Sequence, residues 1–128
     1  MLNSVFAICI GASLGALLRW ALGASLNTLF PFIPLGTLLA NLIGGYLIGL
    51  VLVLFSGLPE LSPEWRLFLV TGLLGGLTTF STFSAEVAIL IQQGRWTLAL
   101  AAISLHVLGS LLMTVFGVWT ATTLKSNS

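Results

Sequence analysis

Long uncharged stretches separate the few charged residues of this chain. Residues 1–18, 20–59, 67–85 and 96–124 contain no Asp, Glu, Lys or Arg. A helix that spans a bilayer requires about 20 predominantly apolar residues. Only 5% of the 128 residues are charged, against about 25% in an average soluble domain. So few charges cannot cover the surface of a soluble domain, and the sequence therefore predicts an integral membrane protein.

Four membrane-spanning helices are predicted, at about residues 4–23, 36–56, 66–92 and 96–122. The uncharged stretch 20–59 is long enough for two spans, but Asn27, Pro31 and Pro34 indicate a loop in its first part. The alternation typical of β-strands is absent. We therefore expect an all-α fold with a single transmembrane domain over residues 1–128.

The basic residues give no clear orientation in the membrane. Four spans place Arg66 and Lys125 on one side of the membrane and Arg19 and Arg95 on the other. Neither side therefore has the excess of Lys and Arg that normally sets the topology. One interpretation is dual topology, in which copies insert both ways and pair as an antiparallel homodimer. The other is that four positive charges are too few for the rule to apply. The charge count alone leaves both open, and stripes of small residues four apart, such as Gly11 and Gly15, favour the dimer.

Composition also limits the chemistry that the chain can perform. The net charge of +1 gives no electrostatic basis for binding a nucleic acid. One Cys, one His and no Asp leave no plausible catalytic group, so no enzyme activity is expected. Arg19 and Glu86 are the only ionisable side chains well inside apolar runs. A functional role, snorkelling and structural pairing all remain open for these two residues.

Polar side chains at mid-membrane depth mark candidate functional positions. Asn41 lies in the middle of the second predicted span, and His106, Ser110 and Thr114 share one face of the fourth. Such groups cost free energy unless a partner satisfies them. Interhelical hydrogen bonds, at about 0.6 kcal/mol each, are the alternative to a functional role. The Asn41 amide is suited both to an anion and to a neighbouring carbonyl. A lone His106 is more often a packing residue than a ligand.

The segment 75–84, with sequence Gly-Gly-Leu-Thr-Thr-Phe-Ser-Thr-Phe-Ser, is poor helix-forming material for the middle of a span. It predicts a break in the third helix, and broken backbone at this depth occurs where it is buried in protein or lines a wet cavity. Phe80 and Phe83 share a face of the helix that follows, and ring edges attract anions. These features predict a pore or transport site for a small ion.

The residues of this segment, together with the segment 36–44 (Gly-Thr-Leu-Leu-Ala-Asn-Leu-Ile-Gly), resemble the Fluc/CrcB family of small bacterial fluoride channels. The likeness extends over the whole chain, including its length and its four spans. The resemblance implies an antiparallel, dual-topology homodimer in the bacterial inner membrane, with two pores that passively export fluoride and confer fluoride resistance.

The resemblance also implies roles for individual residues. A structural Na⁺ at the dimer centre would be held by backbone carbonyls of Gly75 and Thr78. The pore-lining residues would be Asn41, Phe80, Phe83, Ser81, Thr82, Thr37, Ser110 and Thr114. Arg19 and Glu86 lie where the family has charged residues, and their roles stay open.

Two other functions are compatible with a small four-span protein. A dimeric multidrug exporter requires a carboxylate deep in the pore, ideally in the first span, where this chain has Arg19. A non-conducting membrane scaffold would leave the hydroxyl-rich break without a purpose. The fluoride channel is therefore the preferred interpretation.

Overall fold

The computed structural model describes residues 1–128, and it consists of helices joined by short connections. The elements are α1 (Leu2–Leu26), α2 (Leu35–Ser56), α3 (Pro63–Arg66), the π-helix η1 (Leu67–Leu74), α4 (Gly75–Leu77), α5 (Phe80–Gln92) and α6 (Trp96–Ser126). Four segments are long and apolar enough to cross a membrane, and the third of them comprises α3 to α5. The prediction of an all-α chain with four spans is confirmed.

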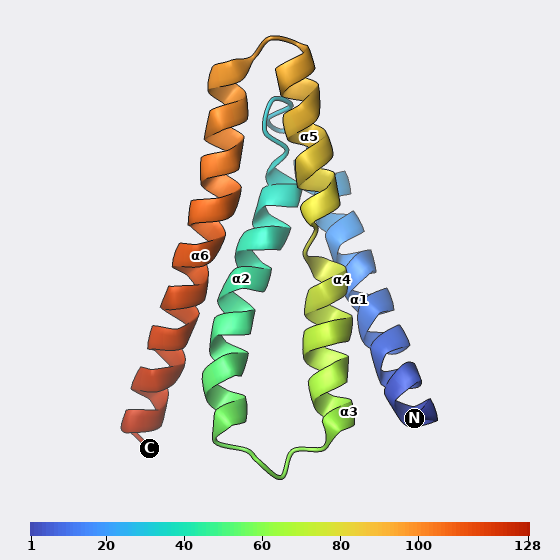
Figure 1. Cartoon of the computed structure of the whole chain (residues 1–128), viewed down its shortest axis with the longest axis vertical. Coiled ribbons are helices and arrows are strands. Elements are labelled where there is room, and N and C mark those ends of the chain that lie inside the picture. Colours follow the sequence, from blue (N-terminus) through green and yellow to red (C-terminus); the bar gives the residue numbers. More distant parts are fainter.

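The third segment runs beside α2 and packs against helices on both sides of the molecule (Figure 1). Its first half, α3 and η1, packs against α1, whereas its second half, α5, packs against α6. Helix α6 also packs against α2, but it does not contact η1. Both termini and the connection between α2 and α3 lie at one end of the molecule, as four spans require (Figure 1).

The predicted break in the third helix is present at Thr78 and Thr79. Both residues have extended backbone, with ψ angles of 153° and 116°. The Thr79 hydroxyl then accepts the Thr82 backbone N–H at 3.1 Å and caps the start of α5. A threonine therefore replaces the helical hydrogen bond that the break removes.

The π-helix η1 was not predicted from the sequence. Such helices are rare and are mostly single-turn bulges, whereas η1 runs for eight residues from Leu67 to Leu74. It begins directly after α3 and ends at Leu74, four residues before the break at Thr78. The wider winding changes which side chains face α1 and α2, because each turn contains more residues than an α-helical turn.

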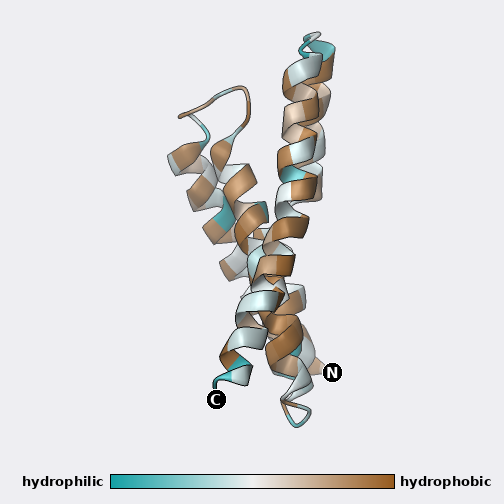
Figure 2. Cartoon of the chain, turned by 90° about the vertical axis from the view of Figure 1, so that its left-hand side faces the viewer, coloured by the Kyte–Doolittle hydropathy of each residue, from teal (hydrophilic) through white to brown (hydrophobic).

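Small residues form many of the helix contacts, and many large apolar residues face outward. Ala40, Ala99 and Ala121 are buried, whereas Leu112 and Val115 are more than 60% exposed. Apolar residues extend along the outer faces of the helices (Figure 2). This distribution is the one expected of helices that pack against each other through small residues and contact lipid elsewhere.

Two helix pairs approach through glycines. Gly49 of α2 faces Gly117 of α6, and a Cβ atom added to Gly49 would lie 2.9 Å from the Val118 nitrogen and 3.1 Å from the Gly117 Cα. Gly11 of α1 faces Gly72 of η1 in the same way. Backbone atoms leave no room for a side chain at these positions.

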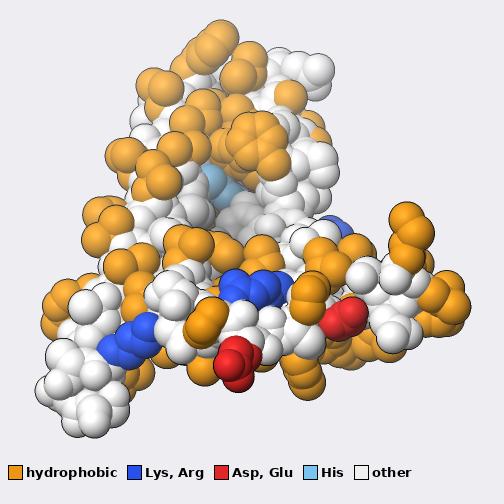
Figure 3. All heavy atoms as spheres, turned by 60° about the horizontal axis from the view of Figure 1, so that its bottom comes forward, with side chains coloured by type: hydrophobic (Ala, Val, Ile, Leu, Met, Phe, Trp, Pro, Cys, Tyr) orange, Lys and Arg blue, Asp and Glu red, His pale blue; other side chains and the backbone are white.

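The end of the molecule that carries both termini also carries several charged side chains (Figure 3). Two of them bind the carbonyls at the C-terminal end of α2 and beyond it. Arg66 donates to the carbonyls of Phe55 and Leu58, at 3.3 and 3.0 Å, and Lys125 donates to that of Val53 at 3.0 Å. Cations at this position also interact favourably with the helix dipole.

We expect Gly49→Ala to lower the free energy of unfolding by about 1–3 kcal/mol, the usual cost of overpacking. The added methyl group would press against the backbone of α6. Gly75→Ala is the matched control, because its Cβ would lie 3.7 Å from the nearest heavy atom, the Val70 oxygen. Unfolding in detergent, followed by circular dichroism, measures both. Equal stability of the two variants would contradict the tight α2–α6 contact.

Candidate functional site

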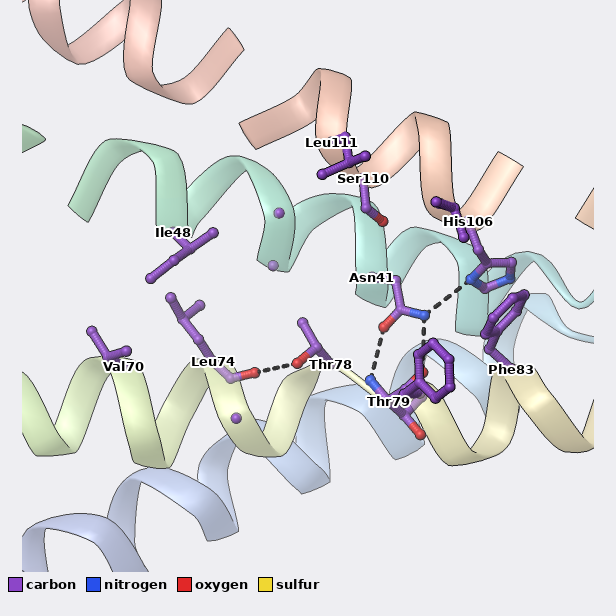
Figure 4. A pocket seen from close by; sticks show the side chains of 15 residues that line it. Asn41, Ile48, Val70, Leu74, Thr78, Thr79, Phe83, His106, Ser110 and Leu111 are labelled. Atoms are coloured by element: carbon purple, nitrogen blue, oxygen red, sulfur yellow. Dashed lines mark hydrogen bonds between the residues drawn. The ribbon is translucent and has the colours of Figure 1, made fainter. Parts of the chain in front are cut away.

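A groove of about 530 Å³ lies between α6 and the third segment, with α2 as its floor. The groove is open to the outside, because α6 and η1 do not touch. Figure 3 shows it as a hollow with a histidine side chain at its back, and Figure 4 shows its lining. Its polar lining residues are Asn41, Thr78, Thr79, His106 and Ser110. None of the lining residues is an acid, a lysine or an arginine.

The Asn41 side chain binds the broken backbone at two points. Its Oδ1 accepts the Thr79 N–H at 2.8 Å, and its Nδ2 donates to the Thr79 carbonyl at 3.0 Å (Figure 4). The amide of α2 therefore replaces the backbone partners that Thr79 would have within a continuous helix. We call this pair of hydrogen bonds the Asn41–Thr79 clamp.

The break changes the hydrogen bonding of two backbone carbonyls. In a continuous helix, the Thr79 N–H would donate to the Gly75 carbonyl and the Thr82 N–H to the Thr78 carbonyl. Here they donate to Asn41 Oδ1 and Thr79 Oγ1 instead. The carbonyls of Gly75 and Thr78 thus lose their helical donors, and both residues line the groove.

His106 lies at the inner end of the groove beside Phe83. The two rings are 4.5 Å apart, and the His106 side chain is 4% exposed. His106 Nδ1 lies 3.0 Å from Asn41 Nδ2, which continues the chain of hydrogen bonds from Thr79 (Figure 4). The other ring nitrogen, Nε2, is buried without a partner.

The two phenylalanines predicted to line a pore differ sharply in exposure. Phe83 is buried, with 7% of its surface exposed, whereas Phe80 is 75% exposed. Their rings are 5.4 Å apart in an edge-to-face arrangement. Phe80 therefore presents most of its ring outside the chain, at the rim of the groove.

Both deep ionisable residues have structural hydrogen bonds. Arg19 Nε donates to the Gly76 carbonyl at 3.0 Å, close to the break. The Thr37 hydroxyl donates to a Glu86 carboxylate oxygen at 2.7 Å. Each residue thus has a structural hydrogen-bond partner, which is one of the interpretations that the sequence left open. These contacts do not pair Arg19 with Glu86.

The structure brings together six of the ten residues predicted to bind Na⁺ or to line the pore. The groove contains Gly75, Thr78, Phe80, Phe83, Asn41 and Ser110. Four others lie outside its lining, namely Thr37, Ser81, Thr82 and Thr114. The Thr114 hydroxyl donates to the Gly45 carbonyl at 2.9 Å, and Thr82 accepts a hydrogen bond from the Thr79 hydroxyl. Their predicted functional roles stay predictions.

Sequence reasoning did not assign His106 and Thr79 to the site. His106 lies one helical turn before Ser110, on the same face of α6, so its place in the row of polar residues was a usable signal. Nothing comparable distinguished Thr79 from the neighbouring hydroxyl residues, because its role depends on a contact with α2.

Comparison with known proteins identifies close relatives. A family profile described as CrcB-like protein, Camphor Resistance (CrcB), matches residues 6–118. A protein of Pseudomonas putida named fluoride-specific ion channel FluC is 66% identical over 120 residues, which are 94% of each chain. Proteins of the same name from Tolumonas auensis and Nitrosomonas europaea are 62% and 54% identical. Their alignments cover 98% and 99% of this chain, and 98% and 100% of the relatives.

We expect Arg19→Met to loosen the break, because the Gly76 carbonyl loses a charge-assisted hydrogen bond worth about 1.5 kcal/mol. Amide hydrogen exchange should become faster in residues 76–80 and stay unchanged in α6. The control is Arg95→Met, which removes only the stacking of Arg95 on Phe32 at 4.4 Å. If exchange at the break were equally slow in both variants, the proposed support from Arg19 would be refuted.

Proposed function

This chain belongs to the CrcB-like family, and on that basis we propose that it is a fluoride-selective channel of the bacterial inner membrane. In this proposal the channel passively exports cytoplasmic fluoride and confers fluoride resistance. The observation that carries the proposal is the high identity, over nearly the whole chain, to relatives named fluoride-specific ion channel. The family is one of channels, not of enzymes.

The groove has the chemistry that conduction of a small anion requires. The Ser110 hydroxyl, the histidine ring and two phenyl rings line it, and no acidic side chain lines it. Hydroxyl and N–H groups can replace part of the hydration of an anion, and ring edges carry positive partial charge. A membrane potential that is negative inside would drive anion efflux without ATP.

The open side of the groove supports an antiparallel homodimer. Phe80 is 75% exposed at the rim, and α6 and η1 leave the groove uncovered. A second copy packed against this face would close the groove and place residues of both chains around it. Two copies would form two such pores, and the balance of two basic residues on each side is compatible with insertion in both orientations.

The carbonyls of Gly75 and Thr78 fit the Na⁺ that the family resemblance implies. Both have lost their helical donors, and neutral carbonyl oxygens are suitable ligands for a hard cation. An antiparallel dimer would bring together two such pairs. In the proposed dimer the bound cation would supply positive charge near pores that otherwise contain only neutral groups.

Fluoride efflux from liposomes that contain the purified protein tests the channel function. We expect fluoride to leave the loaded liposomes rapidly and chloride to be retained. Protein-free liposomes serve as the control for leakage. Absence of fluoride flux, or chloride flux of the same rate, would refute the proposal.

Phe83→Ile should slow fluoride efflux by about tenfold, since a ring interaction worth about 1.4 kcal/mol corresponds to that change in rate. Phe6→Ile is the matched control, because Phe6 is 58% exposed on α1 and does not line the groove. Size-exclusion chromatography must show the same assembly for both variants. Slow flux accompanied by loss of assembly would assign Phe83 to packing instead of conduction.

Dual topology predicts equal labelling of one position from the two sides of the membrane. In a Cys9→Ser background, Ser62→Cys places a single thiol in the connection between α2 and α3. We expect a membrane-impermeant thiol reagent to label about half of the protein in intact spheroplasts and all of it after lysis, because half of the copies face each way in an antiparallel dimer. Labelling of all or none before lysis would show a single orientation.

A further inference from the structure

The chain of hydrogen bonds from Thr79 through Asn41 to His106 determines which His106 nitrogen carries a proton. Asn41 Oδ1 accepts the Thr79 N–H, so the opposite side of the amide must be the NH₂ group. This group donates to the Thr79 carbonyl and faces His106 Nδ1 at 3.0 Å. Because an amide NH₂ only donates, Nδ1 must accept. The neutral ring then carries its hydrogen on Nε2.

That Nε2–H group is a buried donor without a partner. His106 is 4% exposed, and no hydrogen-bond acceptor in the chain reaches Nε2. Buried polar groups in native proteins almost always have a partner, and an orphan donor therefore requires an explanation. Its surroundings include the Phe83 ring, whose centroid lies 4.5 Å from that of the imidazole with an angle of 31° between the ring planes.

The same contacts leave Asn41 without a free donor. One of its two N–H groups is used by the Thr79 carbonyl and the other by His106 Nδ1. The family resemblance implies that Asn41 lines the pore, and its amide is chemically suited both to an anion and to a neighbouring carbonyl. In the structure it is a positioning residue, which holds the broken backbone and orients the imidazole.

We propose that the buried Nε2–H of His106 is a fluoride-binding position, set in its donor tautomer by the Asn41–Thr79 clamp. The proposal rests on the proposed function as a fluoride channel. A small anion that accepts one strong hydrogen bond suits a single buried donor beside a phenyl ring. Chloride is larger and a weaker acceptor, so it should bind this position much less well.

Nitrogen NMR of the protein in lipid bilayers tests the proposal directly, because His106 is the only histidine and needs no assignment. With ¹⁵N-labelled histidine and no fluoride, we expect a protonated Nε2 and an unprotonated Nδ1. Added fluoride should shift the Nε2 resonance, whereas chloride should not. A hydrogen on Nδ1 instead of Nε2 would overturn the proposal. An Nε2 resonance that fluoride leaves unchanged would also overturn it, and would indicate that only water occupies this position.

Asn41→Asp tests the clamp, since a carboxylate accepts the Thr79 N–H but cannot donate to the Thr79 carbonyl or to His106. We expect loss of the Nε2–H tautomer and a fluoride affinity at Nε2 that is at least about tenfold weaker, as for the loss of one hydrogen bond to a charged group. Asn27→Asp is the matched control. Asn27 uses only its Oδ1, which accepts the N–H groups of Gly36 and Thr37 at 2.7 and 3.2 Å. Retention of the tautomer in Asn41→Asp would refute the role of the clamp.

His106→Leu removes the donor without requiring the clamp to change, and His106→Gln restores an N–H donor. We expect fluoride efflux to fall by about tenfold or more in the first variant, as for the loss of one hydrogen bond to a charged acceptor, and to recover partly in the second. If the wild-type protein conducts fluoride and His106→Leu conducts it at the same rate, the inference about His106 is overturned and the proposed channel function stands. Wild-type liposomes without fluoride flux would overturn the proposed function instead.

Discussion

The hydrogen bonds between the Asn41 amide and the Thr79 peptide are the interaction on which the rest of the site depends. An interrupted helix inside a membrane leaves N–H and C=O groups that water cannot satisfy, at a cost of several kcal/mol each. Asn41 satisfies both groups of Thr79 at once, at 2.8 and 3.0 Å. The break can therefore persist at mid-span, and α2 is fixed against the third segment at the same point.

The clamp connects two features that lie on different sides of the break. On the η1 side, Asn41 accepts the Thr79 N–H, which in a continuous helix would donate to the Gly75 carbonyl. The Gly75 oxygen is therefore available to a cation. Toward α6, Asn41 directs an amide NH₂ at His106 Nδ1, so a ring N–H becomes available to an anion. One neutral side chain thus prepares an acceptor for positive charge and a donor for negative charge, without any charged group in the groove.

The sequence was sufficient for the spans and for the break, because both depend on local composition. The four apolar segments and the run of glycines, serines and threonines at 75–84 are visible without knowledge of the fold. The π-helix could not be predicted, since it has no local signature in residues 67–74. The partners of Asn41, Thr37 and Arg19 are 38 to 65 residues away in the chain, so only the packed structure could assign them.

The exclusion of acids from the groove has a consequence for selectivity. Glu86 is the only acid deep in the fold, and the Thr37 hydroxyl holds its carboxylate outside the groove lining. The groups that remain inside are dipoles, whose attraction for an ion depends strongly on how closely the ion approaches. A small anion can approach a ring edge, a hydroxyl and an N–H more closely than a large one. A lining of neutral groups held in place by the clamp therefore interacts more strongly with a small halide than with a large one, through distance and not through net charge.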